Sequence, residues 1–216
     1  MTLAPVVLAG VELQGKVVTG DAQFCQRELS EQVVQQGGAY FWVAKANQPT
    51  LLADLVLLFA EPPPGEPMPA NLRYGKRGDR DEVRLLRCSM ALVGASDWPH
   101  LGYVCTIQRV VTQQGKTRYE QHYAITSLTP AEADAARLQA LWRGHWGIEN
   151  RLHWVRDVTF GEDNNPIHTG QGPMGMAAVR NTVIGALRRA GHTNIAAALR
   201  TYAGKPRAAL ALLGLL

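Results

Sequence analysis

The stretch "GKVVTGDAQFCQRELSEQVVQQGGAYFWVAKAN" (Gly15–Asn47) decides the fold class. Its β-branched start predicts a strand over residues 15–22, and the apolar run over residues 39–47 predicts a second, buried strand. Between them, apolar residues recur at helical spacing until a pair of glycines, which predicts a helix and its end. A helix over residues 48–61, with a proline near its start, follows. This order of strand, helix, strand and helix predicts an α/β fold with parallel strands joined by crossovers.

The pattern changes after the proline-rich stretch "EPPPGEPMP" (Glu61–Pro69). Residues 81–93, 102–111 and 117–128 are strand-like, and the turn "TQQGK" with its glycine separates the last two. Beyond them the spacing of apolar residues is helical. We therefore expect three parts: partial βα units in residues 1–60, a β-rich block in residues 61–128 and a helical part in residues 129–216.

The helical part carries its own start and stop signals. Thr129 is a plausible N-cap, with a proline at the first helical position and Glu132 three residues after the cap. Gly144 and Gly147 weaken the middle of the pattern, so we expect the helix to break there. A last helical region covers residues 172–191.

The composition bounds the class of protein. Of 216 residues, 46% are hydrophobic, which allows a sizeable core, and 22 Lys and Arg against 18 Asp and Glu give a net charge of +4. That surplus permits a polyanionic partner without requiring one. Three cysteines far apart in the sequence argue against a disulfide framework and a cysteine zinc cage. No basic leader and no apolar run of about 20 residues is present, so we expect a soluble, cytoplasmic protein without a membrane partner.

Two charged side chains lie where predicted strands end. Asp21 follows the first strand, a common position for a catalytic carboxylate in an α/β sheet, but Asp is also a favoured N-cap for a following helix. Lys45 lies near the end of the second strand, where it could meet a phosphate or discourage pairing with another strand. Both interpretations stay open for each residue.

Glu149 lies in the stretch "HWGIENRLHWVRDVTFGED" (His145–Asp163). Trp142 precedes it by seven residues, His145 precedes it by four, and Arg156 follows it by seven, so a continuous helix would place all four on one face. A carboxylate flanked by basic residues suits a metal ion beside a phosphodiester. The same spacing also suits a surface ladder of ion pairs.

A rival pattern overlaps this stripe. His145, Glu149 and His153 are spaced by four residues, and three such side chains could bind a transition metal. The metalloprotease motif H-E-x-x-H is absent.

The segment "KRGDRDEVRLLR" (Lys76–Arg87) supplies a further basic group. Arg80 and Arg84 alternate with Glu82, so on a strand they share one face, which is either a strip for the DNA backbone or an ordinary exposed face. Trp142 and the other tryptophans around it suit core packing better than base stacking.

Taken in order, "KVVTGDAQFCQREL", "GGAYFWVAKANQP", "DRDEVR", "YAITSL" and "HWGIENRLHWVRDVTFGED" resemble the successive blocks of insertion-sequence DDE transposases, nearest to the H-repeat-associated group. The resemblance covers nearly the whole chain. In the wider family the catalytic Glu lies in a Y-x2-R-x3-E-x6-K signature, which falls here on Trp142, His145, Glu149 and Arg156, with only the Glu identical. The second catalytic Asp of the family falls on Asp21.

This resemblance implies an RNase H-like fold that binds two Mg²⁺ (or Mn²⁺) ions through three carboxylates and cleaves and joins DNA. The first catalytic Asp of the family precedes the second, yet residues 1–14 contain no Asp. We therefore expect an incomplete RNase H-like fold that lacks its first strands, with a β-rich insertion and C-terminal helices, and a chain that is inactive alone.

The partners implied by the resemblance are the terminal inverted repeats of an insertion sequence, target DNA, and a second copy or a full-length transposase. Two other functions remain open. The chain is either a DNA-binding remnant that inhibits full-length transposase, or a helix-borne transition-metal enzyme that uses His145, Glu149 and His153.

Overall fold

The computed structural model describes residues 3–148, 154–164, 166–167 and 169–214. The chain forms two compact units, Met1–His145 and Trp146–Leu216, which are described separately below. Glu149 and His153 lie outside the described residues.

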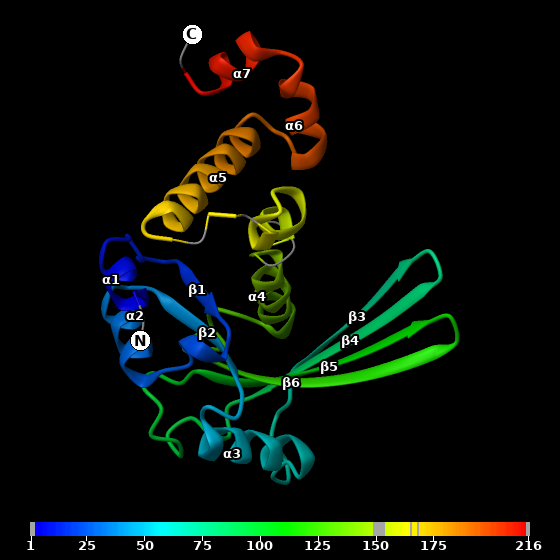
Figure 1. The fold of residues 1–216 in the computed structure, drawn as a ribbon. Coiled ribbons are helices and arrows are strands. Elements are labelled where there is room, and N and C mark those ends of the chain that lie inside the picture. The colour runs from blue at the N-terminus through cyan, green and yellow to red at the C-terminus, as the bar shows by residue number, and fades with distance from the viewer. Residues whose placement is uncertain (1–2, 149–153, 165, 168, 215–216) are drawn as a thin grey trace. The chain divides into compact units, whose positions relative to one another are not determined.

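The first unit is built on one six-stranded sheet with the strand order β1-β2-β6-β5-β4-β3 (Figure 1). Its parallel part is formed by β1 (Val17–Gly20) and β2 (Ala39–Ala44), joined by α2 (Arg27–Gln35). This confirms the expected α/β arrangement at the start of the chain. All other neighbours are antiparallel, and these strands are β3 (Ala70–Arg77), β4 (Arg80–Ser89), β5 (Tyr103–Gln113) and β6 (Lys116–Thr126).

Helices pack on both faces of this sheet near β2. Because successive side chains of a strand point to opposite faces, Tyr40 and Trp42 of β2 enter one core and Phe41 and Val43 enter the other. The first core lies under α2 and α3 (Pro49–Ala60), and the short helix α1 (Ala4–Ala9) contacts α2. The second core lies under α4 (Ala135–Ile148). Burial on both faces explains why β2 is an uninterrupted apolar run.

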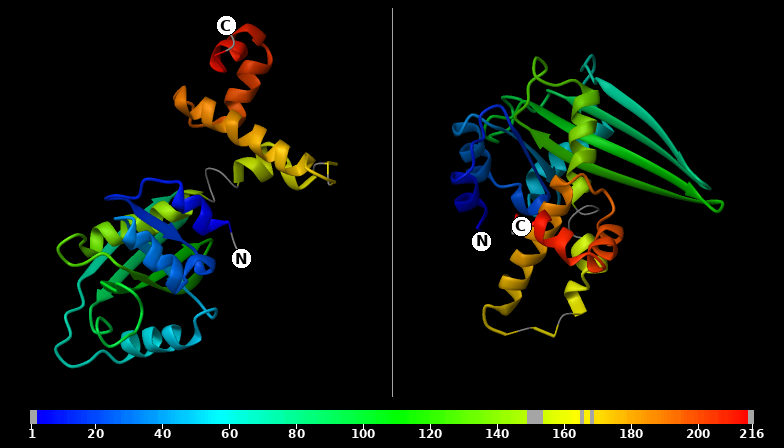
Figure 2. Two further views of the ribbon diagram at one scale, coloured as in Figure 1. Left: turned by 90° about the vertical axis from the view of Figure 1, so that its left-hand side faces the viewer. Right: turned by 90° about the horizontal axis from the view of Figure 1, so that it is seen from above.

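The four antiparallel strands extend well beyond these helices (Figures 1 and 2). We call residues 71–77, 80–86, 107–113 and 116–122 the distal strands. The β3 part is largely exposed, with the Tyr74 side chain 76% exposed, whereas the β4 and β5 parts are mostly half-buried. Strand β3 is not predicted from the sequence, because a strand with neither face buried shows no alternation of apolar residues.

The start of α4 differs from the sequence-based expectation. The helix begins at Ala135, and the Asp134 carboxylate caps it by accepting a hydrogen bond from the Arg137 N–H at 2.7 Å. The pair of Thr129 and Glu132 forms its hydrogen bonds in a turn that precedes the helix. The expected break at the two glycines is also wrong, because α4 continues to Ile148.

The second unit is helical. It contains a π-helical turn η3 (Val155–Thr159), a 3₁₀ turn η4 (Glu162–Asn164), and the helices α5 (Gly172–Arg189), α6 (Ile195–Ala203) and α7 (Pro206–Leu212). Its core is formed by Val155, Ile184, Leu187, Ile195 and Ala198. Among the described helices of the chain, none has the length and apolar character that a bilayer crossing requires.

Candidate functional site

Asp21 directly follows β1 and is exposed. Its Oδ1 accepts a hydrogen bond from the Gln23 N–H at 3.0 Å and so caps the 3₁₀ turn η1 (Ala22–Phe24). The neighbouring end of β2 is tied to the same turn, because Asn47 Nδ2 donates to the carbonyl oxygen of Ala22 at 2.6 Å. The capping interpretation of Asp21 is therefore correct. A cap that uses one oxygen leaves the carboxylate on the surface, at the carboxyl ends of two parallel strands, where open α/β sheets place their ligands.

The last turns of α4 lie beside β1. His145 Nδ1 is 3.4 Å from Thr19 Oγ1, and Thr19 precedes Asp21 by two residues in the chain. Residues two apart on a strand point to the same face. The contact therefore brings His145 to the end of the strand that leads to Asp21. In the sequence, Glu149 follows His145 by four residues.

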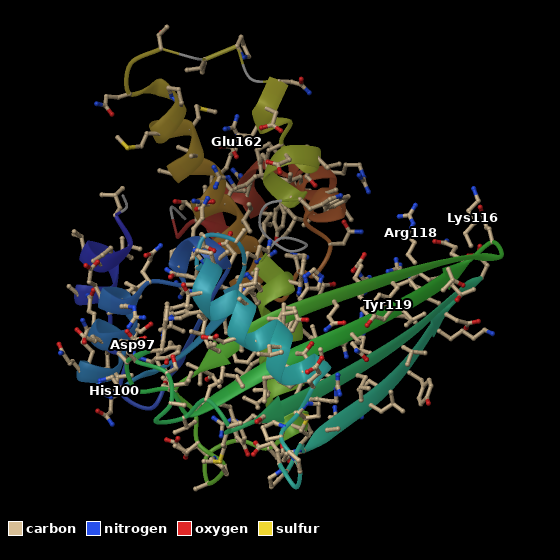
Figure 3. All side chains as sticks on the ribbon, turned by 90° about the horizontal axis from the view of Figure 1, so that it is seen from below. Asp97, His100, Lys116, Arg118, Tyr119 and Glu162 are labelled. Carbon is tan, nitrogen blue, oxygen red and sulfur yellow. The ribbon has the colours of Figure 1, made fainter. Side chains whose placement is uncertain are left out.

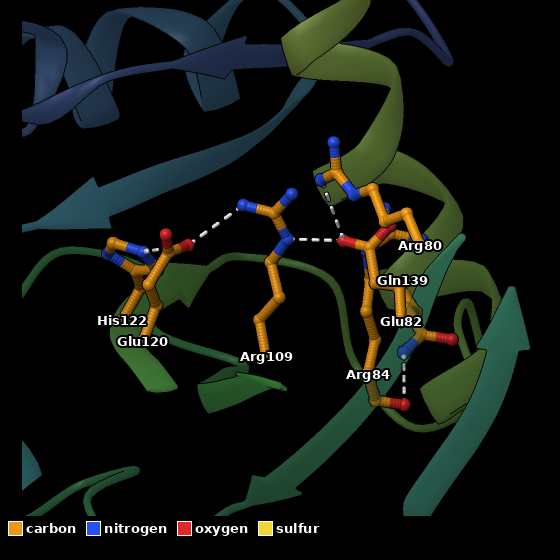
Figure 4. A network of polar contacts seen from close by, with 7 residues as sticks. All are labelled: Arg80, Glu82, Arg84, Arg109, Glu120, His122 and Gln139. Carbon is orange, nitrogen blue, oxygen red and sulfur yellow. Dashed lines mark hydrogen bonds and ion pairs between the residues drawn. The ribbon is translucent and has the colours of Figure 1, made fainter. Parts of the chain in front are cut away.

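Two buried side chains hold α4 on the sheet. The Trp142 ring is only 3% exposed and packs edge-on against Phe41 of β2, with ring centroids 5.6 Å apart. Gln139 is buried as well, and its Nε2 donates to the carbonyl oxygen of Asn71 at 3.4 Å and to that of Arg84 at 3.3 Å. Figure 4 shows the contact with Arg84. Trp142 thus takes the core-packing interpretation that the sequence allowed, and the two side chains fix the helix to β2 and to β3 and β4.

The sheet surface on the side of α4, which we call the α4 face, is strongly basic on the distal strands. Cross-strand pairing fixes which residues share this face, because residues directly opposite one another project to the same side. Three successive rows run across β3, β4, β5 and β6: Arg77, Arg80, Gln113 and Lys116; Gly75, Glu82, Val111 and Arg118; Arg73, Arg84, Arg109 and Glu120. Seven cations and two carboxylates give this face a net charge of +5, more than the +4 of the whole chain.

The opposite face of the same strands is nearly neutral. Its three rows are Lys76, Asp81, Thr112 and Thr117; Tyr74, Val83, Val110 and Tyr119; Leu72, Leu85, Gln108 and Gln121. Its one cation, Lys76, lies 3.4 Å from its one carboxylate, Asp81. The cations of the distal strands are therefore concentrated on one side, and Figure 3 shows Lys116 and Arg118 projecting from β6 near its turn.

Glu82 lies at the centre of the basic rows (Figure 4). Its side chain is 13% exposed, its Oε2 is 2.7 Å from Arg84 Nη2, and its Oε1 accepts a hydrogen bond from Arg109 Nε. Arg80 Nη2 lies farther away, at 4.0 Å. Burial by itself raises the pKa of the Glu82 carboxyl, but the Arg109 hydrogen bond and the three positive charges outweigh it, so the pKa is lowered. Glu82 is therefore ionised and neutralises part of an arginine cluster.

The network continues toward the end of β2. Arg109 Nη1 donates to Glu120 Oε2 at 2.8 Å, and His122 Nε2 lies 3.9 Å from the same oxygen. Burial lowers the pKa of His122, and the charges of Lys45 and Arg109 lower it further against the opposing effect of Glu120. Lys45, just beyond β2, therefore acts on His122, while Arg80 and Arg84 of β4 lie together around Glu82.

Arg156 belongs to the second unit, in the π-helical turn η3. Its Nε and Nη2 donate to the two carboxylate oxygens of Glu162 at 2.5 and 2.6 Å, and Arg180 Nη1 lies 3.4 Å from Glu162 Oε1. The arginine that the sequence placed on a stripe with Glu149 thus forms a bidentate ion pair inside its own unit. Among the described residues, no three His, Cys, Asp or Glu side chains gather in a metal-binding cluster. Two of the three residues of the transition-metal hypothesis, Glu149 and His153, lie outside the described residues.

Sequence reasoning did not single out Arg73, Arg109, Lys116 and Arg118. Each follows from strand register, which the alternation of β4 alone does not determine. The local signal that could have found two of them is the alternation of Lys116 and Arg118 with threonine and tyrosine in residues 116–119, which places both cations on one face of a strand.

The chain is similar to transposases. A family model described as "Transposase DDE domain" matches residues 1–183. Among curated proteins, "Putative protein YbfL" of Escherichia coli K12 is 29% identical and "H repeat-associated putative transposase YhhI" of the same strain is 28% identical, and both alignments cover 87% of this chain and 51% of the relative. The chain thus spans about half the length of these curated relatives. A sugar N-methyltransferase from Streptoalloteichus matches 57% of this chain and 45% of its own with a TM-score of 0.25 and 14% identity, which carries no argument about the fold.

Proposed function

Because the chain belongs to the transposase DDE-domain family, with H-repeat-associated relatives, we propose that it takes part in DNA cleavage and strand transfer at the ends of an insertion sequence. In this proposal, Asp21 and Glu149 are two of the carboxylates that hold the catalytic metal ions. The observation that carries the assignment is the contact between His145 and Thr19, which brings α4 to the strand that ends at Asp21.

The donor set suits a hard divalent cation. Asp21 offers an exposed carboxylate, and Mg²⁺ and Mn²⁺ prefer oxygen ligands of this kind. Bound there, the metal ions would activate the attacking oxygen and stabilise the leaving oxygen of a phosphodiester. The residues themselves have simpler tasks: Asp21 and Glu149 ligate, and Trp142 and Gln139 keep α4 in place. Because two carboxylates hold two ions weakly, we propose that residues 1–216 alone are inactive, or nearly so, and that a third carboxylate is needed.

The proposal places the DNA along the α4 face. Lys45, Arg80 and Arg84 would contact the phosphate backbone there, with His145 near the reacting phosphate. Arg156, in the second unit, would also contact DNA, through guanidinium N–H groups other than the two that donate to Glu162. DNA binding without cleavage, which the sequence left open, is the part of the proposal that the charge of +5 on this face supports directly.

Metal binding tests the assignment of the two carboxylates. We expect Mn²⁺ titration, followed by the loss of the free-ion electron paramagnetic resonance signal, to show binding to the wild-type chain. That binding should be lost in Asp21→Asn and in Glu149→Gln. Asp54→Asn is the matched control, because Asp54 is an exposed carboxylate on α3, on the opposite face of the sheet. Unchanged Mn²⁺ binding in Asp21→Asn would overturn the proposed metal site.

A further inference from the structure

The arginine cluster around Glu82 is unfavourable by itself. Arg77 lies directly opposite Arg80, and Arg84 lies directly opposite both Arg73 and Arg109. Like charges directly opposite one another destabilise a pair of strands. Departures from favourable pairing of this kind occur chiefly at functional sites, so we expect these arginines to serve a function that offsets their repulsion. The purpose that fits a flat strip of guanidinium groups is the binding of a polyanion.

Glu82 occupies the place where such an anion would bind. Its carboxylate is held by Arg84 at 2.7 Å and by a hydrogen bond from Arg109, and Arg80 is 4.0 Å away. Phosphate and carboxylate oxygens make the same kind of charge-assisted hydrogen bonds to guanidinium groups. Arg118, in the next strand but one on the same cross-strand row, is exposed, and within the described residues it takes part in no ion pair. The row of Glu82 therefore contains one arginine, Arg118, that is free to meet a phosphate, and the two neighbouring rows contain the three arginines that Glu82 partly neutralises.

We propose that Glu82 is an internal anion that weakens the hold of the α4 face on duplex DNA by neutralising Arg80, Arg84 and Arg109. This inference rests on the proposed function, because it presumes that DNA lies along this face. Glu82 acts through the arginines and is a positioning residue. Its effect is to keep binding of the DNA backbone moderate and reversible.

The salt dependence of DNA binding tests this proposal. The probe is a short fluorescein-labelled duplex of random sequence, and the readout is fluorescence anisotropy between about 50 and 200 mM KCl. Each phosphate contact contributes close to one unit to the slope of log K against log salt. We expect Glu82→Gln to make the slope steeper by about one unit and to tighten binding roughly fivefold to tenfold near 0.1 M salt. We expect Arg118→Ala to do the reverse by the same amount.

The adjacent residue of the same strand supplies a matched control. Asp81→Asn removes the same charge as Glu82→Gln, but Asp81 is on the opposite, neutral face beside Lys76. Since charges farther than about 10 Å from the bound phosphates are largely screened near 0.1 M salt, Asp81→Asn should change the affinity by less than about twofold. Lys76→Ala serves as the same control for Arg118→Ala.

The possible outcomes distinguish a failure of the proposed function from a failure of the proposed role of Glu82. A wild-type chain that fails to bind the duplex at any of these salt concentrations would overturn the proposed function. A wild-type chain that binds, with Glu82→Gln unchanged or weaker, would overturn only the role of Glu82. Equal effects of Glu82→Gln and Asp81→Asn would show a response to net charge and would also overturn it. If Glu82→Gln fails to fold, as circular dichroism would show, Arg118→Ala against Lys76→Ala still decides whether this face binds DNA.

Discussion

The packing of Trp142 against the sheet makes a prediction that can be worked through in free energy. We consider the substitution Trp142→Ala. The ring is 3% exposed and lies edge-on to Phe41, so the substitution removes nearly the whole buried surface of the side chain. A tryptophan buries about 150–250 Å², which at about 25 cal/mol per Å² corresponds to about 4–6 kcal/mol. Partial collapse of the site reduces the loss, and measured truncations of large aromatic residues cost about 3–5 kcal/mol.

Equilibrium unfolding in urea, followed by far-UV circular dichroism, measures this loss. With a slope near 2 kcal/mol per molar, a loss of about 3–5 kcal/mol lowers the midpoint by about 2 M. We expect Trp142→Phe to lose less, because a smaller ring keeps part of the contact with Phe41. Leu57→Ala is the control for apolar truncation in general, since Leu57 is 60% exposed on α3 and should cost about 0.5 kcal/mol or less.

One result would refute this reasoning about α4. If Trp142→Ala lowered the free energy of unfolding by less than about 1 kcal/mol, the helix would not depend on its buried ring. The buried ring would then not hold α4 over the sheet, and it would not position His145 beside Thr19.

Three further predictions follow from single features. The hydrogen bond from Arg156 holds the pKa of Glu162 below its ordinary value. The stability that this pair gives the second unit should therefore be present above about pH 4.3 and be lost as the pH falls through the lowered pKa. Glu162→Gln should remove that part of the pH dependence of thermal unfolding. Gly102→Ala should cost about 1–3 kcal/mol in urea unfolding, because the added Cβ would lie 2.4 Å from the carbonyl oxygen of Leu128; a stability equal to wild type would contradict the close approach. Burial raises the pKa of Cys88 to about 11, and all three cysteines are buried. Ellman's reagent at pH 8 should therefore react with the thiols only as the chain unfolds. A thiol that reacts at once would disprove the burial of the cysteines.

The parts of the fold that the sequence predicted are those with a local signal. The strand before Asp21, the helix over residues 27–35 and the buried strand of residues 39–44 each carry a periodicity that matches their burial. Strand β3 has no such signal, because both of its faces lie outside the cores. The predicted start of α4 was wrong for a different reason. Thr129 and Glu132 form their hydrogen bonds in a turn before the helix, and Asp134 supplies the actual cap.

In the candidate site, too, the features with a local sequence signal were predicted and those that depend on strand pairing were not. The alternation of Arg80 and Arg84 around Glu82 was visible in the sequence, and their common face follows from it. That Arg109 and Arg118 join them depends on which strands pair and in which register, which is information from distant parts of the chain. The helix α4 also continues through Gly144 and Gly147, because helix propensity is a weak guide to where a helix ends.

The position of β3 at the end of the sheet has a consequence for solubility. An outermost strand presents a row of backbone donors and acceptors that another chain can pair with, as in cross-β aggregation. Arg73, Lys76 and Arg77 lie on this strand. If two copies approached each other edge to edge, the three cations of one β3 would repel the three cations of the other. We therefore expect these charges to oppose edge-to-edge pairing, and a chain in which they were neutralised to form fibrils or precipitate more readily than the natural one.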